Sequence, residues 1–149
     1  MRTIMRATLY AGLAVLALVG TTGQAMALGW GPIRSSIGTA YGDYYNEGNS
    51  FARTNSSYKD NRPGGAPVYV RTVYQFYVQT CTSGCSASYA SYATRTTVRS
   101  NSASYRYSYT HYNLQPESDR VRGVINICQD EAYTYDPCSD TTSYPSFAY

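Results

Sequence analysis

The stretch that decides the fold is VYVRTVYQFYVQT, residues 68–80. Apolar, aromatic or β-branched side chains occupy every second position of this stretch. Because successive side chains of a strand point to opposite faces of a sheet, this alternation predicts a long β-strand with one buried face. The residues of that face are Val68, Val70, Thr72, Tyr74, Phe76 and Val78.

Other segments with the same alternation lie on both sides of this strand. The predicted strands span residues 33–45, 50–58, 86–99, 103–112 and 121–128. Residues typical of turns separate them, and the Leu- and Ala-rich runs that favour helices stop at residue 27. We therefore expect an all-β protein, an antiparallel β-sandwich or small barrel of about six to seven strands.

The first 27 residues read as a secretory signal peptide. Arg2 and Arg6 precede an apolar stretch at residues 9–19, and the segment closes on Ala25-Met26-Ala27. The apolar stretch is shorter than the roughly 20 residues that span a bilayer, so we expect secretion without membrane insertion. We predict a signal peptide at 1–27, a flexible apolar N-terminal segment at 28–36 and a single β-sandwich domain at 37–149.

The charge balance excludes one class of partner. Removing Arg2 and Arg6 with the signal lowers the formal net charge from +3 to +1. A strongly basic nucleic-acid-binding protein would need a much larger excess of positive charge. We therefore expect no nucleic-acid partner.

Four cysteines in an exported chain predict two disulfides. We predict the pairs Cys81–Cys85 and Cys128–Cys138, because each pair encloses a turn. Thr82-Ser83-Gly84 lies between Cys81 and Cys85, and Asp136-Pro137 lies just before Cys138. The spacing of the second pair differs from that of structural zinc sites, so we expect no metal and no cofactor. Calcium binding by an acidic cluster remains an alternative; the cluster is Asp130, Glu131, Asp136 and Asp140.

The sequence offers few groups for catalysis. His111 is the only histidine and lies among tyrosines on a predicted strand, while the disulfides occupy all four thiols. A small cell-wall-active hydrolase or toxin would need two facing carboxylates, and it is the less favoured alternative. Its candidate residues are Asp43, Glu47, Glu117, Asp119 and the acidic cluster.

Tyrosine is the most unusual feature of the composition. The chain has 18 tyrosines, and Tyr105, Tyr107 and Tyr109 share one face of a predicted strand. Such a ladder can bind a protein, stack on sugar rings or pack into the core, because tyrosine combines a wide ring with a hydroxyl. All three interpretations stay open at the level of sequence.

The segment that follows the predicted cleavage site is the second unusual feature. It reads Leu28-Gly29-Trp30-Gly31-Pro32-Ile33 and contains the only tryptophan. We expect Leu28, Trp30, Pro32 and Ile33 to insert into a groove of a partner protein, because the flanking glycines let a partner approach the backbone closely. The alternative is that Trp30 folds back over an edge of its own sandwich.

Four features of the chain together point to a family of known proteins. They are the signal peptide, the apolar start at residues 28–33, the Cys81/Cys85 hairpin and the segment ending Asp136-Pro137-Cys138-Ser139. The chain resembles small exported, disulfide-stapled β-sandwich proteins of actinobacterial type, such as the adaptor subunits of umbrella toxin particles. The resemblance implies that the N-terminal segment binds one partner subunit and that another sandwich surface binds a stalk protein.

These observations favour a secreted, non-enzymatic protein-binding or adaptor module, which we expect to be a subunit of an extracellular assembly with other secreted proteins. A carbohydrate-binding, lectin-like module that stacks tyrosines on glycans is the alternative. Strands with few charges can also pair edge to edge, so self-assembly is a further hypothesis.

Overall fold

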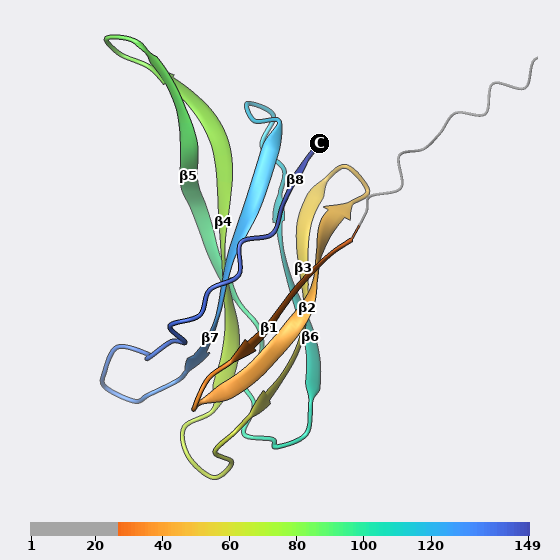
Figure 1. The fold of residues 1–149 in the computed structure, drawn as a ribbon, viewed down its shortest axis with the longest axis vertical. Coiled ribbons are helices and arrows are strands. Elements are labelled where there is room, and N and C mark those ends of the chain that lie inside the picture. The colour runs from red at the N-terminus through yellow and green to blue at the C-terminus, as the bar shows by residue number, and fades with distance from the viewer. Residues whose placement is uncertain (1–26) are drawn as a thin grey trace, which may run out of the picture.

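The computed structural model describes residues 27–149, which form strands, turns and loops and contain no helix (Figure 1). The predicted signal peptide, apart from Ala27, lies outside the described residues. Between residues 27 and 149 no helix is long and apolar enough to cross a membrane.

Two antiparallel four-stranded sheets make up the fold. The first sheet has the order β1 (Leu28–Arg34), β2 (Gly38–Glu47), β3 (Phe51–Asp60) and β6 (Arg106–Asn113). The second has the order β5 (Cys85–Thr96), β4 (Val68–Cys81), β7 (Arg120–Gln129) and β8 (Ser146–Ala148). The predicted all-β antiparallel sandwich is confirmed, with eight strands in place of six to seven.

One of the additional strands arises because the predicted strand at residues 33–45 contains a turn. The Ser35 N–H donates to the carbonyl of Gly38 at 3.0 Å, and the Gly38 N–H donates to Ser35 Oγ at 3.2 Å. A serine hydroxyl that bonds nearby backbone groups competes with the ladder of a strand. The chain reverses here, so β1 and β2 form a hairpin. The C-terminal segment supplies the other additional strand, β8.

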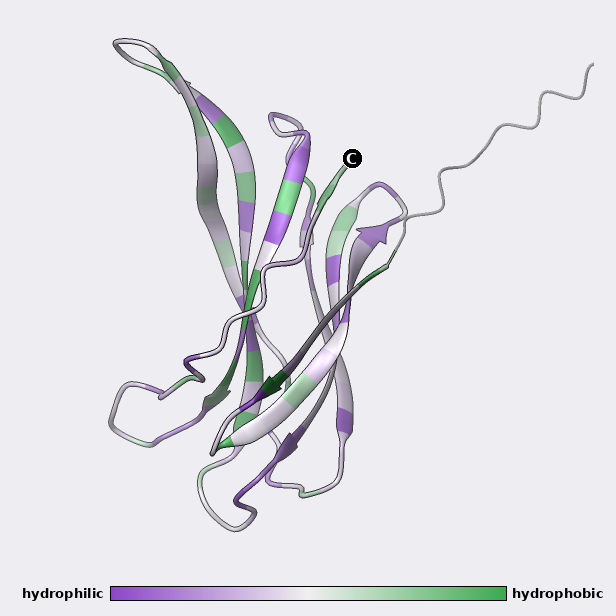
Figure 2. Ribbon diagram, in the orientation of Figure 1, coloured by the Kyte–Doolittle hydropathy of each residue, from purple (hydrophilic) through white to green (hydrophobic). Residues whose placement is uncertain are grey.

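The core lies between the sheets, and the predicted face of β4 points into it. Figure 2 shows hydrophobic and hydrophilic residues in alternating bands along β4. Apolar side chains of β7 and of the first sheet meet this face. Besides β4 residues, the core contains Trp30, Ile33, Ala40, Tyr44, Ala52, Tyr58, Val121, Ile125 and Ile127.

Tyrosines replace part of the aliphatic core, and the hydroxyls of Tyr58 and Tyr74 are hydrogen-bonded inside the protein, whereas the buried hydroxyl of Tyr44 has no hydrogen-bond partner. The Tyr74 hydroxyl lies 3.1 Å from Thr54 Oγ1 and 2.9 Å from Thr110 Oγ1, so it links the two sheets. The Tyr58 hydroxyl donates to the carbonyl of Val98. A buried hydroxyl with a partner avoids most of the cost of leaving water, which lets tyrosine serve as a core residue.

Both predicted disulfides are confirmed. Cys81–Cys85 closes the tip of the β4–β5 hairpin, and Cys128–Cys138 ties the end of β7 to the C-terminal segment. The paired Cα atoms lie 4.2 and 4.0 Å apart. Two disulfides in a small domain indicate an oxidising, extracellular environment.

Candidate functional site

The three tyrosines of the predicted ladder lie on the outside of the first sheet. Tyr105, Tyr107 and Tyr109 are 49, 59 and 48 % exposed, whereas the next inward-pointing residue, Thr110, is buried against Tyr74. Since side chains alternate along β6, the bond from Thr110 to Tyr74 fixes the odd-numbered tyrosines outward. The interpretation of this ladder as core is wrong, and a surface ladder remains.

Neighbouring strands extend the ladder into a broad surface. Tyr107 lies opposite Ser57 of β3, which in turn lies opposite Tyr41 of β2, a residue that is 43 % exposed. Two rows further along the same face, Arg53 of β3 lies between Tyr45 of β2 and His111 of β6. We call this surface the tyrosine face; its residues are Tyr41, Tyr45, Arg53, Lys59, Tyr105, Tyr107, Tyr109 and His111.

Contacts between rings hold the tyrosine face in one arrangement. The rings of Tyr41 and Tyr105 meet edge to face with centroids 5.3 Å apart, which is a favourable aromatic geometry. The imidazole of His111 stacks on Tyr109 with centroids 6.0 Å apart and also contacts Phe51. His111 therefore belongs to this aromatic surface.

Cations lie over the rings of the tyrosine face. The guanidinium of Arg53 lies 3.9 Å from the centroid of Tyr109 and forms an ion pair with Glu47. The ammonium of Lys59 lies 5.2 Å from the centroid of Tyr105. A cation over an aromatic face is attracted by the negative charge density of the ring, so these pairs further fix the side chains.

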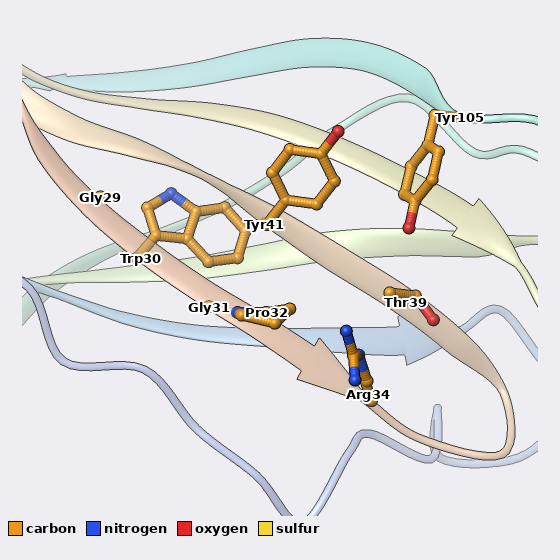
Figure 3. A pocket seen from close by; sticks show the side chains of 8 residues that line it. All are labelled: Gly29, Trp30, Gly31, Pro32, Arg34, Thr39, Tyr41 and Tyr105. Atoms are coloured by element: carbon orange, nitrogen blue, oxygen red, sulfur yellow. The ribbon is translucent and has the colours of Figure 1, made fainter.

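A hollow of about 540 Å³ opens beside Tyr41 and Tyr105, at the β1 edge of the tyrosine face (Figure 3). The side chains of Arg34 and Thr39 supply polar groups to its wall. The other lining residues are Gly29, Trp30, Gly31, Pro32, Tyr41 and Tyr105. The hollow thus combines aromatic walls with a guanidinium and a hydroxyl.

The N-terminal segment forms part of the same sheet, which corrects the prediction of a flexible segment at 28–36. Leu28–Arg34 is strand β1 and pairs with β2. Trp30 is only 4 % exposed, and its Nε1 donates to the carbonyl of Asn55 at 3.1 Å. Ile33 is buried as well, while Leu28 is half-buried and Pro32 is exposed. The sandwich provides its own groove for Trp30, so the alternative of folding back is the one observed.

Two glycines make this seat for Trp30 possible. Trp30 lies opposite Gly42, where a Cβ atom would come within 1.9 Å of the Asn55 carbonyl oxygen and 3.1 Å of Trp30 Nε1. Gly31 has a φ of +83° in the bulge between Trp30 and Ile33, and a Cβ there would lie 2.9 Å from the Ala40 carbonyl oxygen. The bulge allows both Trp30 and Ile33 to point inward.

Several of the carboxylates considered for catalysis or calcium binding have partners within the protein. Glu47 pairs with Arg53, and Asp130 pairs with Arg99. The Tyr69 hydroxyl donates to Asp136 at 2.6 Å, and this bond lowers the pKa of Asp136. Burial, followed by the bond to Asp136, raises the pKa of Tyr69 to about 12.

Asp43 lies apart from Glu117 and Asp119. Asp43 is on the outer side of β2, and Glu117 and Asp119 line a separate open hollow beside Tyr77 and Gln79. In the part of the chain that the structure describes, no group of three or more His, Cys, Asp or Glu residues could hold a metal ion. The disulfides account for every cysteine.

Comparison of the chain with protein-family models, with curated proteins and with solved structures finds no match.

Proposed function

We propose that the protein is an exported, non-enzymatic binding module whose tyrosine face docks onto another extracellular protein. One observation carries this proposal: Tyr41, Tyr105, Tyr107 and Tyr109 expose about half of each side chain on one sheet face. Tyrosine is enriched in protein interfaces because its ring offers a large contact area at a low cost in conformational entropy.

The arrangement of the tyrosine face supports recognition of a protein. Because the rings of Tyr41, Tyr105 and Tyr109 are already held by Arg53, Lys59 and one another, these side chains lose little freedom on binding. Cations and the carboxylate of Asp43 lie among the rings, so polar contacts can surround aromatic anchors.

The role proposed for the N-terminal segment changes with the structure. In place of inserting Trp30 and Ile33 into a partner, β1 buries both and forms the edge of the hollow beside the tyrosine face. Of the four residues predicted to insert, only Pro32 and, in part, Leu28 stay accessible for a partner. The binding role therefore moves from the segment itself to the sheet face that it completes.

Secretion and assembly form part of the same proposal. The two disulfides favour an oxidising compartment, in agreement with the signal peptide expected from residues 1–27. An adaptor needs two binding surfaces, and the second sheet of the sandwich leaves room for one away from the tyrosine face.

The test is capture from the producer's culture fluid by a C-terminally tagged chain, followed by identification of stoichiometric partners by mass spectrometry. We expect the double variant Tyr107→Ala/Tyr109→Ala to lose a partner that the parent chain retains. Tyr133→Ala/Tyr135→Ala is the matched control, because these tyrosines are fully exposed in a loop outside the tyrosine face. Equal retention by both double variants would exclude the tyrosine face as the site.

Glycan binding is the second candidate, and the hollow beside Tyr105 favours it. Aromatic walls next to the Arg34 guanidinium and the Thr39 hydroxyl can stack on a sugar ring and bond its hydroxyl groups. Retention on cell-wall or glycan matrices that is lost in Tyr105→Ala would support this function. Protein capture that persists while glycan retention is absent would exclude it.

A further inference from the structure

The four edges of the two sheets differ in how well they are protected. β1 carries Pro32 and a bulge, and β8 has only three residues. β6 has eight residues and begins with the charged Arg106. β5 has 12 residues, contains no proline or glycine and has Arg95 as its only charged residue. Proline, charge, bulges and short length are the usual ways in which natural sheets prevent edge-to-edge pairing, so β5 is the least protected of these edges.

β5 is also the most accessible strand. Nine of its residues are exposed, including neighbours that point to opposite faces. Within residues 27–149 it pairs with β4 alone, so its outer edge presents backbone groups without a neighbouring strand. Figure 1 shows the β4–β5 hairpin projecting beyond the rest of the sandwich.

We propose that β5 pairs antiparallel with β5 of a second copy of this chain. The two second sheets then join into one continuous sheet of eight strands across a twofold axis. Such an isologous contact uses the same edge of both copies and closes as a dimer. It leaves the tyrosine face free, because that face belongs to the other sheet.

The regular part of β5 sets the register of the pair. Residues 85–91 pair with β4 without interruption, and the register shifts next to Ser91, where Tyr92 is the extra residue. A twofold axis at Ser88 uses this whole stretch. It places Ala87 opposite Tyr89 of the second copy, so a small side chain lies beside each large one.

The lack of charge on this edge permits a second copy as the occupant. The stretch from 85 to 91 reads CSASYAS and has no charged residue, so it neither attracts nor repels an identical strand. The two Arg95 side chains lie at opposite ends of the antiparallel pair and do not approach each other. Backbone hydrogen bonds between the two edges then supply the attraction, as in other cases of strand addition.

The test uses Ser88, the one position that meets its own copy across the axis. Ser88 is exposed, so a charged residue there leaves the hairpin itself intact. We expect the parent chain to dimerise reversibly in sedimentation equilibrium at increasing concentration. Ser88→Lys and Ser88→Glu should each weaken this dimer about fivefold, because like charges directly opposite each other repel.

A mixture of the two Ser88 variants tests the proposed register most directly. Ser88→Lys and Ser88→Glu together should form a heterodimer at least as tight as the parent dimer. Ser86→Lys, which places its charge opposite Ala90, is the control and should weaken the dimer less. A parent chain that stays monomeric, a dimer that both Ser88 variants leave unchanged, or a mixture that forms no heterodimer would overturn the proposal.

Discussion

The buried tyrosines between the sheets and the exposed tyrosines of β6 have opposite environments although the residue is the same. Tyr74 shares its hydroxyl with two threonines from the first sheet, and burial raises its pKa. Tyr107, on the outward-pointing side of β6, is more than half exposed. The difference shows that position in the alternation decides whether a tyrosine packs in the core or is available for binding.

The largest expected difference between the buried and the exposed tyrosines is in stability, and removing one ring from each group tests it. Tyr74→Ala should lower the free energy of unfolding by about 3–5 kcal/mol, because it leaves a cavity and two threonine hydroxyls without their shared partner. Tyr107→Ala should change it by no more than about 0.5 kcal/mol. Urea unfolding of both variants measures this, and similar losses would mean that the two sets are not distinct.

Trp30 tests whether the N-terminal strand belongs with the buried set. Trp30→Ala should cost about 3 kcal/mol, because it removes a ring that is almost fully buried and its bond to Asn55. Arg34→Ala, at an exposed position of the same strand, is the control and should cost much less. A Trp30 variant as stable as the parent chain would restore the idea of a free insertion segment.

The contribution of the Tyr74 hydroxyl to stability can be measured separately from that of its ring. Tyr74→Phe keeps the ring and removes only the bonds to Thr54 and Thr110, so we expect a loss of about 1–2 kcal/mol. Adding Thr54→Val and Thr110→Val should restore part of that loss, because the unpaired hydroxyls are then gone. Chemical denaturation of this series shows whether hydroxyl pairing stabilises the core.

For Tyr69 we predict a smaller effect on the free energy of unfolding, and this effect depends on pH. Its pKa is raised to about 12 from an ordinary value of 10.0, so its stabilising contribution is present below pH 10 and is lost as the pH rises toward 12. The stability of the parent chain should therefore fall more steeply over this interval than that of Tyr69→Phe. Parallel slopes in urea unfolding would show that Tyr69 ionises as readily in the folded chain as in the unfolded chain.

Much of the fold follows from local alternation, and the rest depends on which strands pair. The alternation at residues 68–80 predicts β4 and its buried face, and the short loops predict both disulfides. The turn at Ser35 is harder to foresee, because the residues around it continue the alternating pattern of a strand.

The candidate site shows the same limit. Spacing places Tyr105, Tyr107 and Tyr109 on one side of a strand, but only the bond from Thr110 to Tyr74 of the opposite sheet determines that this side faces outward. Tyr41, Arg53 and Lys59 join the surface because β6 pairs with β3. That pairing joins segments far apart in the sequence, and nothing local to either strand indicates it.

The measurement that tests the central claim most directly is nitration of the tyrosines, mapped by mass spectrometry, in the free protein and in its complex with the captured partner. We predict that Tyr105, Tyr107 and Tyr109 react in the free protein and are protected in the complex, while Tyr133 reacts in both and Tyr74 in neither. Equal reaction of Tyr105, Tyr107 and Tyr109 in the two states would contradict the assignment of the tyrosine face as the binding surface.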